Sequence, residues 1–140
     1  MCLKLVGRIH GLIRLLLVDD EKDNLLLFKD ILNDVGFVVD AYYDHVQALL
    51  EYKPNYYDLL ILDYLMPQLN GIELFKKIKE MDRSPKVMLL TASHEQLETE
   101  NFGQSEFKVV RKPVKITDFL QEINAIFAND KSQQIINTTA

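Results

Sequence analysis

The feature that most constrains the fold is an uninterrupted apolar run, Leu59 to Leu62, that ends on the carboxylate of Asp63. Such a run, bounded by polar residues, is typical of a strand buried on both faces, as in a parallel sheet. An unpaired carboxylate in the dry middle of that strand would be costly, so Asp63 is expected at the strand's carboxyl end. Open parallel sheets place their ligand sites at that edge. We therefore expect a functional site beside Asp63.

Apolar segments and helical patterns alternate along the chain, and this alternation predicts the fold class. The expected strands are Ile13 to Val18, Phe37 to Tyr42, Leu59 to Leu62, Val87 to Leu90, and Phe107 to Val110. Short connections between such strands force them to run parallel, with helices on both faces of one sheet. The prediction is a single α/β domain built as a (βα)5 three-layer sandwich.

Apolar residues at helical spacing predict the intervening helices. We expect Asp23 or Asn24 to cap the first helix, Gly36 to end it, and Asp44 to cap the second. The predicted apolar faces are Leu25, Phe28, Ile31, Leu32 and Val35; then Val46, Leu49 and Leu50; then Ile72, Phe75, Ile78 and Met81; and finally Ile116, Phe119, Leu120, Ile123, Ile126 and Phe127. Ser93 to Gly103 is polar almost throughout, so we expect it to be weakly held and mobile.

Composition and the chain ends predict the domain limits and exclude some classes of function. Residues 1–12 read as an N-terminal extension without the apolar centre of a signal peptide, residues 13–128 as the domain, and residues 129–140 as a flexible polar tail. A net charge of -5 argues against direct nucleic-acid binding, and no apolar stretch is long enough for a membrane span. The single cysteine, Cys2, cannot form an intramolecular disulfide and favours a reducing, cytoplasmic location.

Four of the five predicted strands are followed by a charged or hydroxyl side chain that could take part in a reaction. These residues are Asp19 and Asp20, Asp63, Thr91, and Lys112. In a parallel sheet these ends share one edge, where three carboxylates repel, so either their pKa values rise or a cation joins them. Oxygen ligands without histidine or cysteine favour Mg²⁺. A hydroxyl and an ammonium suit phosphoryl oxygens, and Asp63 is then the natural nucleophile, forming an acyl phosphate.

Each of these residues has an ordinary alternative interpretation. An acid pair after a strand often only caps a helix, a threonine can simply end a strand, and Lys-Pro commonly begins a loop. What favours a functional interpretation is their order, with acid pair, acid, hydroxyl and amine each at a strand end of one alternating fold.

Four motifs carry a resemblance to a known family. They are the acidic opening Leu15 to Glu21, the loop Asp63 to Gly71 with its Met-Pro and Asn-Gly, the segment Leu89 to Ala92, and Lys112-Pro113. With these motifs the chain resembles the receiver domain of two-component response regulators, over about residues 13–128. The resemblance implies a flavodoxin-like parallel sheet of order 2-1-3-4-5. It also implies a cis Lys112-Pro113 peptide bond.

The resemblance further implies that Asp63 accepts a phosphoryl group from a histidine kinase or histidine phosphotransfer protein. Mg²⁺, for which Mn²⁺ could substitute, would be held by Asp20, Asp63 and the main-chain carbonyl of Leu65, with Asp19 acting through water. Leu65 and Ser93 flank the acceptor in motif position. We expect them to set the lifetime of the aspartyl phosphate by controlling access of water.

One departure concerns the switch that reports phosphorylation. Many family members carry an aromatic residue three positions before the lysine, but here that residue is Val109. Phe107 lies two residues earlier on the same strand face and is expected to be far from Thr91. The expected output surface comprises Ser93 to Gly103 with Phe102, the fifth strand and the last helix.

The expected role is signalling by phosphorylation-dependent binding of a downstream protein, not enzymatic turnover, with a monomer or a weak phosphorylation-dependent dimer. The first alternative is a phosphohydrolase with an aspartyl nucleophile. Such an enzyme needs a second aspartate, as its acid/base, two residues after the first, but this chain has Leu65 at that position. A pseudo-receiver that binds partners without phosphate is the other alternative, although the complete acid set speaks against it. The sequence contains no helix-turn-helix or basic segment that would predict a transcription factor.

Overall fold

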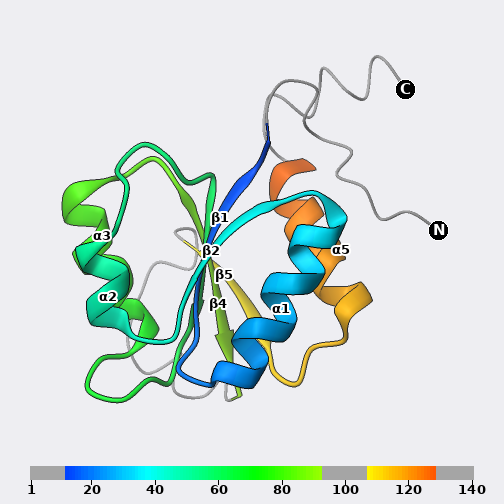
Figure 1. Ribbon diagram of the computed structural model, residues 1–140, viewed down its shortest axis with the longest axis horizontal. Helices are drawn as coiled ribbons and strands as arrows, with labels where there is room; N and C mark the ends of the chain where they lie inside the picture. The colour runs from blue at the N-terminus through cyan, green and yellow to red at the C-terminus, as the bar shows by residue number, and fades with distance from the viewer. Residues whose placement is uncertain (1–11, 93–106, 129–140) are drawn as a thin grey trace.

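The computed structural model describes residues 12–92 and 107–128, which form one parallel sheet with helices on both of its faces (Figure 1). The strands are β1 (Arg14–Val18), β2 (Val38–Tyr42), β3 (Leu59–Asp63), β4 (Lys86–Thr91) and β5 (Lys108–Arg111), and the helices are α1 (Lys22–Val35), α2 (His45–Leu50), α3 (Gly71–Met81) and α5 (Ile116–Ala128). Each expected strand is present. Most of the strand ends lie one residue away from the expected position, and the others lie at it.

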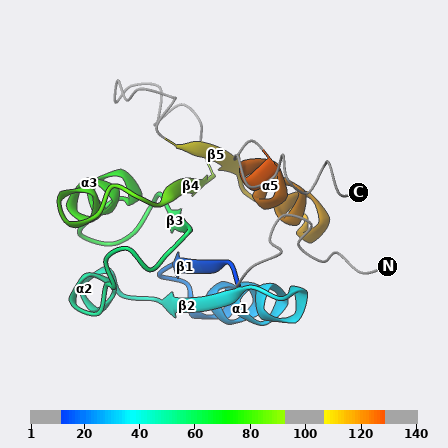
Figure 2. The same ribbon diagram turned by 90° about the horizontal axis from the view of Figure 1, so that it is seen from above.

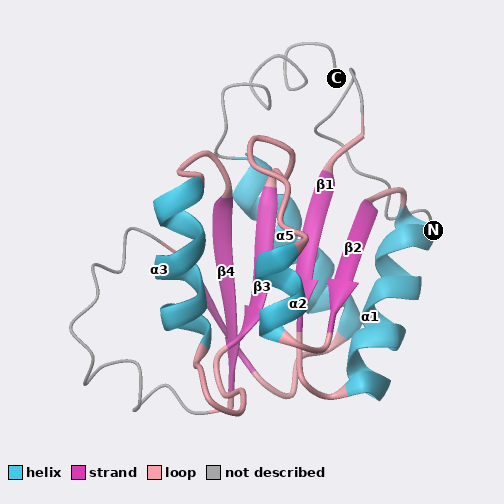
Figure 3. Ribbon diagram, turned by 60° about the vertical axis from the view of Figure 1, so that its left-hand side comes forward, coloured by secondary structure: helices cyan, strands magenta, loops and turns pink. Residues whose placement is uncertain are grey.

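The sheet has the order β2-β1-β3-β4-β5, which confirms the predicted topology. All neighbouring strands pair in parallel, with β3 between β1 and β4. Figure 3 shows the strands pointing the same way, so that their carboxyl ends share one edge. Every residue of β3 is buried, as the unbroken apolar run predicted.

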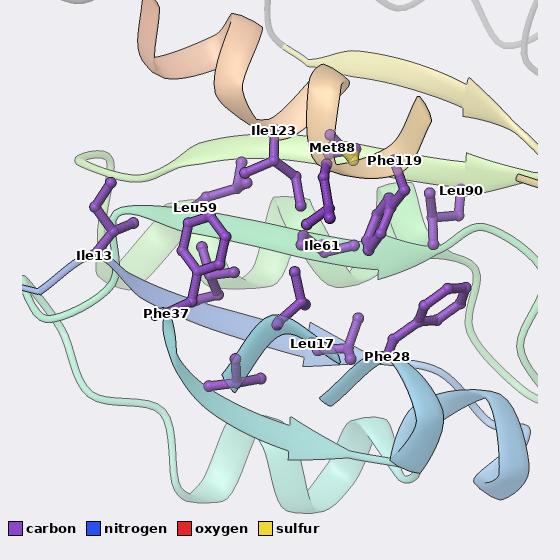
Figure 4. Packing of buried hydrophobic residues seen from close by; sticks show 14 of the residues in the cluster. Ile13, Leu17, Phe28, Phe37, Leu59, Ile61, Met88, Leu90, Phe119 and Ile123 are labelled. Carbon is purple, nitrogen blue, oxygen red and sulfur yellow. The ribbon is translucent and has the colours of Figure 1, made fainter. Parts of the chain in front are cut away.

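The helices form the two outer layers, with α1 and α5 on one face of the sheet and α2 and α3 on the other (Figure 2). Alternate residues of β3 supply the two cores: Leu59 and Ile61 lie in the α1/α5 core, and Leu60 and Leu62 in the α2/α3 core. Figure 4 shows the first of these cores, in which Phe28 packs on Phe119 with ring centroids 5.0 Å apart.

Helix α1 ends as predicted but begins differently. Gly36 has φ 113° and its N–H donates to Asn33 O, which is the left-handed ending that glycine favours. At the other end Glu21 is the first flanking residue and makes no side-chain cap. The predicted cap by Asp23 or Asn24 was therefore wrong, because both residues lie inside the helix. Asp23 still places its charge in the first turn, where the helix dipole favours it.

Helix α2 shows the largest difference from expectation. Asp44 caps it as predicted, accepting a hydrogen bond of 2.9 Å from Val46 N. Its expected apolar face was wrong for two of three residues, however, because Val46 is 48% exposed and Leu50 is 76% exposed. Leu49 is half-buried and packs against the α2/α3 core, and Ala48 is buried in it. The reason is tertiary: Tyr52 and Tyr57, which follow the helix, fill the α2/α3 core instead.

Two residues at helix ends also differ from expectation. Met81 and Ile116 were predicted in apolar faces but are 47% and 40% exposed. Each is a terminal residue of its helix, where the chain turns away from the sheet. Leu74 of α3, which the predicted face omitted, is buried.

A buried carboxylate joins the loops at the opposite edge of the sheet from Asp63. Asp82 accepts hydrogen bonds from Tyr52 Oη (2.8 Å), Asn55 N (3.0 Å), Ser84 N (3.0 Å) and Ser84 Oγ (2.6 Å). Burial raises the pKa of Asp82, but hydrogen bonds from Ser84, Asn55 and Tyr52 outweigh that effect and lower it to about 2. Asp82 therefore stabilises the fold as an ion.

Several expectations fall on segments outside the described residues. They are the mobility of Ser93 to Gly103, the flexible tail over residues 129–140, and, apart from Leu12, the N-terminal extension. The domain limits of residues 13–128 stay a prediction. In the part of the chain that the structure describes, no helix combines the length and the apolar character needed to cross a bilayer.

Candidate functional site

The sheet brings the predicted site residues to its carboxyl edge. Asp19 directly follows β1, Asp63 ends β3, Thr91 ends β4, and Lys112 directly follows β5. Backbone hydrogen bonds continue the strand pairing to this edge: Tyr64 N donates to Leu90 O (2.8 Å) and Lys112 N donates to Thr91 O (2.7 Å). The rigid ladder, rather than any loop, therefore sets the spacing of acid, hydroxyl and amine.

The charged side chains of this edge meet in one cluster. Lys112 Nζ lies 2.9 Å from Asp63 Oδ1 and 3.6 Å from Asp19 Oδ2. Carboxylate oxygens of Asp19, Asp20 and Asp63 all lie within 4.8 Å of one another. Asp19 and Asp63 are buried, whereas Asp20 is exposed. The cluster is thus closed toward the core and open to solvent beside Asp20.

Burial and charge perturb the ionisation of this cluster. Burial raises the pKa of Asp63, Lys112 opposes that rise, and Asp19 and Asp20 add to it, so that the pKa reaches about 7. Burial alone would lower the pKa of Lys112, but its contacts with Asp63 and Asp19 outweigh burial and raise it. One ammonium therefore does not fully compensate three carboxylates.

The donor set fits a hard divalent cation. Asp19 Oδ1 accepts a hydrogen bond from Glu21 N at 3.0 Å, but Asp19 Oδ2 is buried and, among the described residues, has no hydrogen-bond partner. Its nearest cation is Lys112 Nζ at 3.6 Å, so a buried oxygen without a hydrogen bond beside two further carboxylates has room for a bound cation or water. Carboxylate oxygens without nitrogen or sulfur donors match the preference of Mg²⁺.

The loop after β3 brings the start of α3 against the backbone of Asp63. Asn70 caps α3 in a capping box: its side chain accepts from Glu73 N (2.9 Å), and the Glu73 side chain accepts from Asn70 N (3.1 Å). Gly71 N donates to Tyr64 O at 2.8 Å. A Cβ on Gly71 would lie only 2.6 Å from Asp63 O, so the close approach requires glycine.

The role of Gly71 was not recognised from the sequence, which indicated only turn chemistry at Asn70-Gly71. The Asn-Gly pair was the available signal. The contact between Gly71 and the Asp63 carbonyl depends on how α3 packs against β3 and β4, which local sequence does not encode.

The remaining predicted site residues lie around this centre. Leu65 follows Asp63 by two residues, and its side chain is 52% exposed. Thr91 is 1% exposed. The Lys112–Pro113 peptide bond is cis. Ser93 and Phe102 lie outside the described residues.

The residues of the expected switch, Val109 and Phe107, lie in β5 and directly before it. Val109 pairs with Leu89 in the sheet and is half-buried. Phe107 packs edge-on against Phe75 of α3, with ring centroids 6.2 Å apart and an interplanar angle of 77°. The aromatic ring nearest to the expected switch position in sequence is thus in contact with α3.

A sheet of this order with an acid triad, a threonine and a lysine at its carboxyl edge defines a class of phosphoryl-binding α/β proteins. The model of the response regulator receiver domain matches residues 15–124, so the chain belongs to the response regulator receiver family. Response regulator ArlR of Staphylococcus aureus is 31% identical over 128 residues, which are 89% of this chain and 57% of that protein. The chain therefore spans about half the length of the curated relatives it matches.

Solved structures agree with the fold. Chemotaxis protein CheY4 of Vibrio cholerae superposes with a TM-score of 0.74 at 21% identity, covering 83% of this chain and 99% of that one. Response regulator TrrA of Thermotoga maritima, solved in complex with Mg²⁺ and BeF, has a TM-score of 0.70 at 26% identity, covering 82% of this chain and 99% of that one.

The family gives the coarse function. The chain is a receiver domain, and receiver domains are generally signalling modules that interact with histidine kinases or phosphotransfer proteins. Receiver domains bind Mg²⁺ in an acidic pocket, and this chain has a cluster of three aspartates at the corresponding edge.

Proposed function

We propose that Asp63 accepts a phosphoryl group from a histidine kinase or histidine phosphotransfer protein in a Mg²⁺-dependent reaction. The observation that carries this proposal is the ion pair of 2.9 Å between Lys112 and Asp63, set within a cluster of three carboxylates at the end of the central strand. A lysine that contacts the nucleophile also lies within reach of a phosphoryl group attached to it.

The transfer balances as a displacement at phosphorus. An oxygen of the ionised Asp63 carboxylate attacks phosphorus and an O–P bond forms. The bond from phosphorus to the donor's imidazole nitrogen breaks, its electron pair stays on nitrogen, and that nitrogen takes up a proton. Lys112 neutralises one phosphoryl oxygen, and the Thr91 hydroxyl donates a hydrogen bond to another.

A divalent cation would be held by Asp20, Asp63 and the main-chain carbonyl of Leu65, with Asp19 acting through water. Mg²⁺, or Mn²⁺ in its place, would supply charge that offsets the repulsion between carboxylate and phosphoryl oxygens. Asp19 Oδ2, which is buried and accepts no hydrogen bond from the described residues, supports this assignment. Because Asp63 has a pKa of about 7 in the cluster alone, a cation also favours the ionised form that attacks.

The output is a change in protein binding. Thr91 moves toward the phosphoryl group, and the surface formed by β5, α5 and the segment with Phe102 changes with it. Val109 offers no aromatic ring to follow Thr91, and Phe107 is engaged with Phe75. We therefore assign to Val109 a smaller displacement than an aromatic residue would make, and to Phe107 the task of holding β5 against α3. Leu65 and Ser93 set the lifetime of the aspartyl phosphate.

The remaining parts of the proposal concern the protein as a whole. Residues 13–128 act as the receiver, with an extension before them and a tail after them. The protein works in the cytoplasm, binds a downstream protein rather than nucleic acid, and catalyses only its own phosphorylation and dephosphorylation.

The dependence on a cation tests the proposal. The chain is incubated with acetyl phosphate in Mg²⁺ or in EDTA, and phosphoprotein is measured over time. We expect phosphorylation in Mg²⁺ that EDTA abolishes, and a much slower reaction for Asp20→Asn. An exposed acidic control in the middle of α1, Asp30→Asn, should react like the wild type. Equal rates with and without Mg²⁺ would contradict the assigned cation site.

A further inference from the structure

The α2/α3 face carries an exposed apolar groove that the phosphoacceptor site does not use. The groove has a volume of about 630 Å³ and lies between α2 and α3, which cover the same face of the sheet (Figure 2). Val46 and Leu50 of α2 and Met81 of α3 line it and are 48%, 76% and 47% exposed. Val46 and Leu50 are four residues apart and so lie on one side of α2.

Three apolar side chains of this groove, Val46, Leu50 and Met81, lie outside the α2/α3 core, whereas Leu49 and Leu69 also contribute to that core. From α2 and the segment after it, the core takes Ala48, Tyr52 and Tyr57. A six-residue helix that leaves a valine and a leucine exposed to water forgoes part of the stabilisation that their burial would give, and neighbouring exposed apolar residues of this kind commonly mark contact surfaces.

The charges on the groove are self-complementary. Lys77 and Glu80 of α3 both line it, and both are exposed. Three residues apart, they are neighbours on one face of the helix. A two-fold axis passing between them would set Lys77 against the partner's Glu80 and Glu80 against the partner's Lys77. Isologous contacts require this pattern, in which a cation and an anion share one patch.

The charge of the groove also suits a second copy. The whole chain has a net charge of -5, so two copies repel over most of their surfaces. The groove instead pairs one lysine with one glutamate, so two chains that meet there bring together their electrically balanced faces.

We propose that two copies of this chain associate through the α2/α3 groove, with Val46, Leu50 and Met81 at the centre and reciprocal Lys77–Glu80 pairs at the rim. One end of the groove is formed by Gln68 and Leu69, which belong to the loop between Asp63 and α3. A second copy seated there would contact the phosphoacceptor loop.

Sedimentation equilibrium of the full chain over a range of concentrations tests the proposal. We expect a monomer–dimer equilibrium, which Leu50→Lys weakens roughly tenfold or more, because it places a charge at the apolar centre. Leu27→Lys on α1 is the matched control, since Leu27 is 52% exposed and α1 covers the opposite face of the sheet from the groove (Figure 2). It should leave the dissociation constant unchanged. Circular dichroism shows that each variant is folded.

A charge swap distinguishes this specific interface from nonspecific association. Lys77→Glu alone should weaken the dimer, and adding Glu80→Lys should restore it, because the reciprocal pairs are then rebuilt with their signs exchanged. A chain that stays monomeric at every concentration would overturn the proposal. So would a Leu27→Lys variant that weakens association as much as Leu50→Lys, or a double swap that fails to restore it.

Discussion

Replacing Gly71 by alanine tests how closely α3 must approach the phosphoacceptor strand. The added Cβ would lie 2.6 Å from Asp63 O and 3.1 Å from both Tyr64 Cα and Leu89 Cδ2. Ordinary contact begins at 3.4 Å, so the backbone contact must open by about 0.8 Å. Two of the three atoms are backbone atoms, which cannot simply rotate away. The start of α3 must therefore move relative to β3.

The cost follows from general magnitudes. Overpacking of this kind costs about 1–3 kcal/mol. Alanine recovers at most about 1 kcal/mol of helix propensity relative to glycine. We therefore expect Gly71→Ala to lower the free energy of unfolding by about 1–2 kcal/mol. Because the shift acts on the carbonyl of Asp63 itself, we also expect phosphorylation by acetyl phosphate to slow severalfold.

Gly36→Ala provides the control, since it also adds a Cβ to a glycine that the structure requires, but for its backbone conformation and not for lack of space. Gly36 has φ 113° but no atom within 4 Å of an added Cβ. Its substitution should cost about 1 kcal/mol through backbone strain while leaving the phosphorylation rate unchanged. Urea unfolding and the phosphorylation time course give the two readouts. The reasoning is refuted if Gly71→Ala reacts at the wild-type rate, or if Gly36→Ala slows the reaction equally.

Three further predictions follow from individual side chains. Asp82 has a pKa of about 2 when folded, against an ordinary value near 4, so its stabilisation is present above about pH 4 and is lost as the pH falls toward 2. The wild type should lose about 2 kcal/mol more between pH 5 and pH 2 than Asp82→Asn does, measured by urea unfolding; equal losses would contradict the assignment. Lys112→Ala should slow phosphorylation at least tenfold, because the site loses the ammonium that lies 2.9 Å from Asp63 Oδ1; an unchanged rate would contradict its role. Replacing Leu65 and Ser93 by asparagine should change the half-life of the phosphoprotein, and an unchanged half-life would refute their control of water access.

Much of the fold could be predicted because its signals are local or periodic. The apolar run before Asp63 identified a strand buried on both faces, and the β3 burial agrees. The residues that follow or end the strands could be assigned to one edge, because parallel strands leave no other arrangement. This is why the cluster around Asp63 and Lys112 was foreseeable from sequence alone.

What could not be predicted depends on contacts between distant segments. Helix α2 has an apolar pattern, but Tyr52 and Tyr57 occupy the core that this pattern would fill. The cap of α1 was misplaced because helix boundaries are set within a residue or two by the turn that precedes them. The tight fit of Gly71 against Asp63 O, likewise, arises only when α3 is packed on the sheet.

The most direct test of the account is intact mass spectrometry of the chain after incubation with acetyl phosphate and Mg²⁺, beside Asp63→Asn treated identically. Asn keeps the shape of the side chain but removes the nucleophilic carboxylate. We expect the wild type to gain the mass of one phosphoryl group and Asp63→Asn to gain none. A wild-type chain that gains no mass, or an Asp63→Asn chain that gains the same mass, would contradict the assignment of Asp63 as the phosphoacceptor.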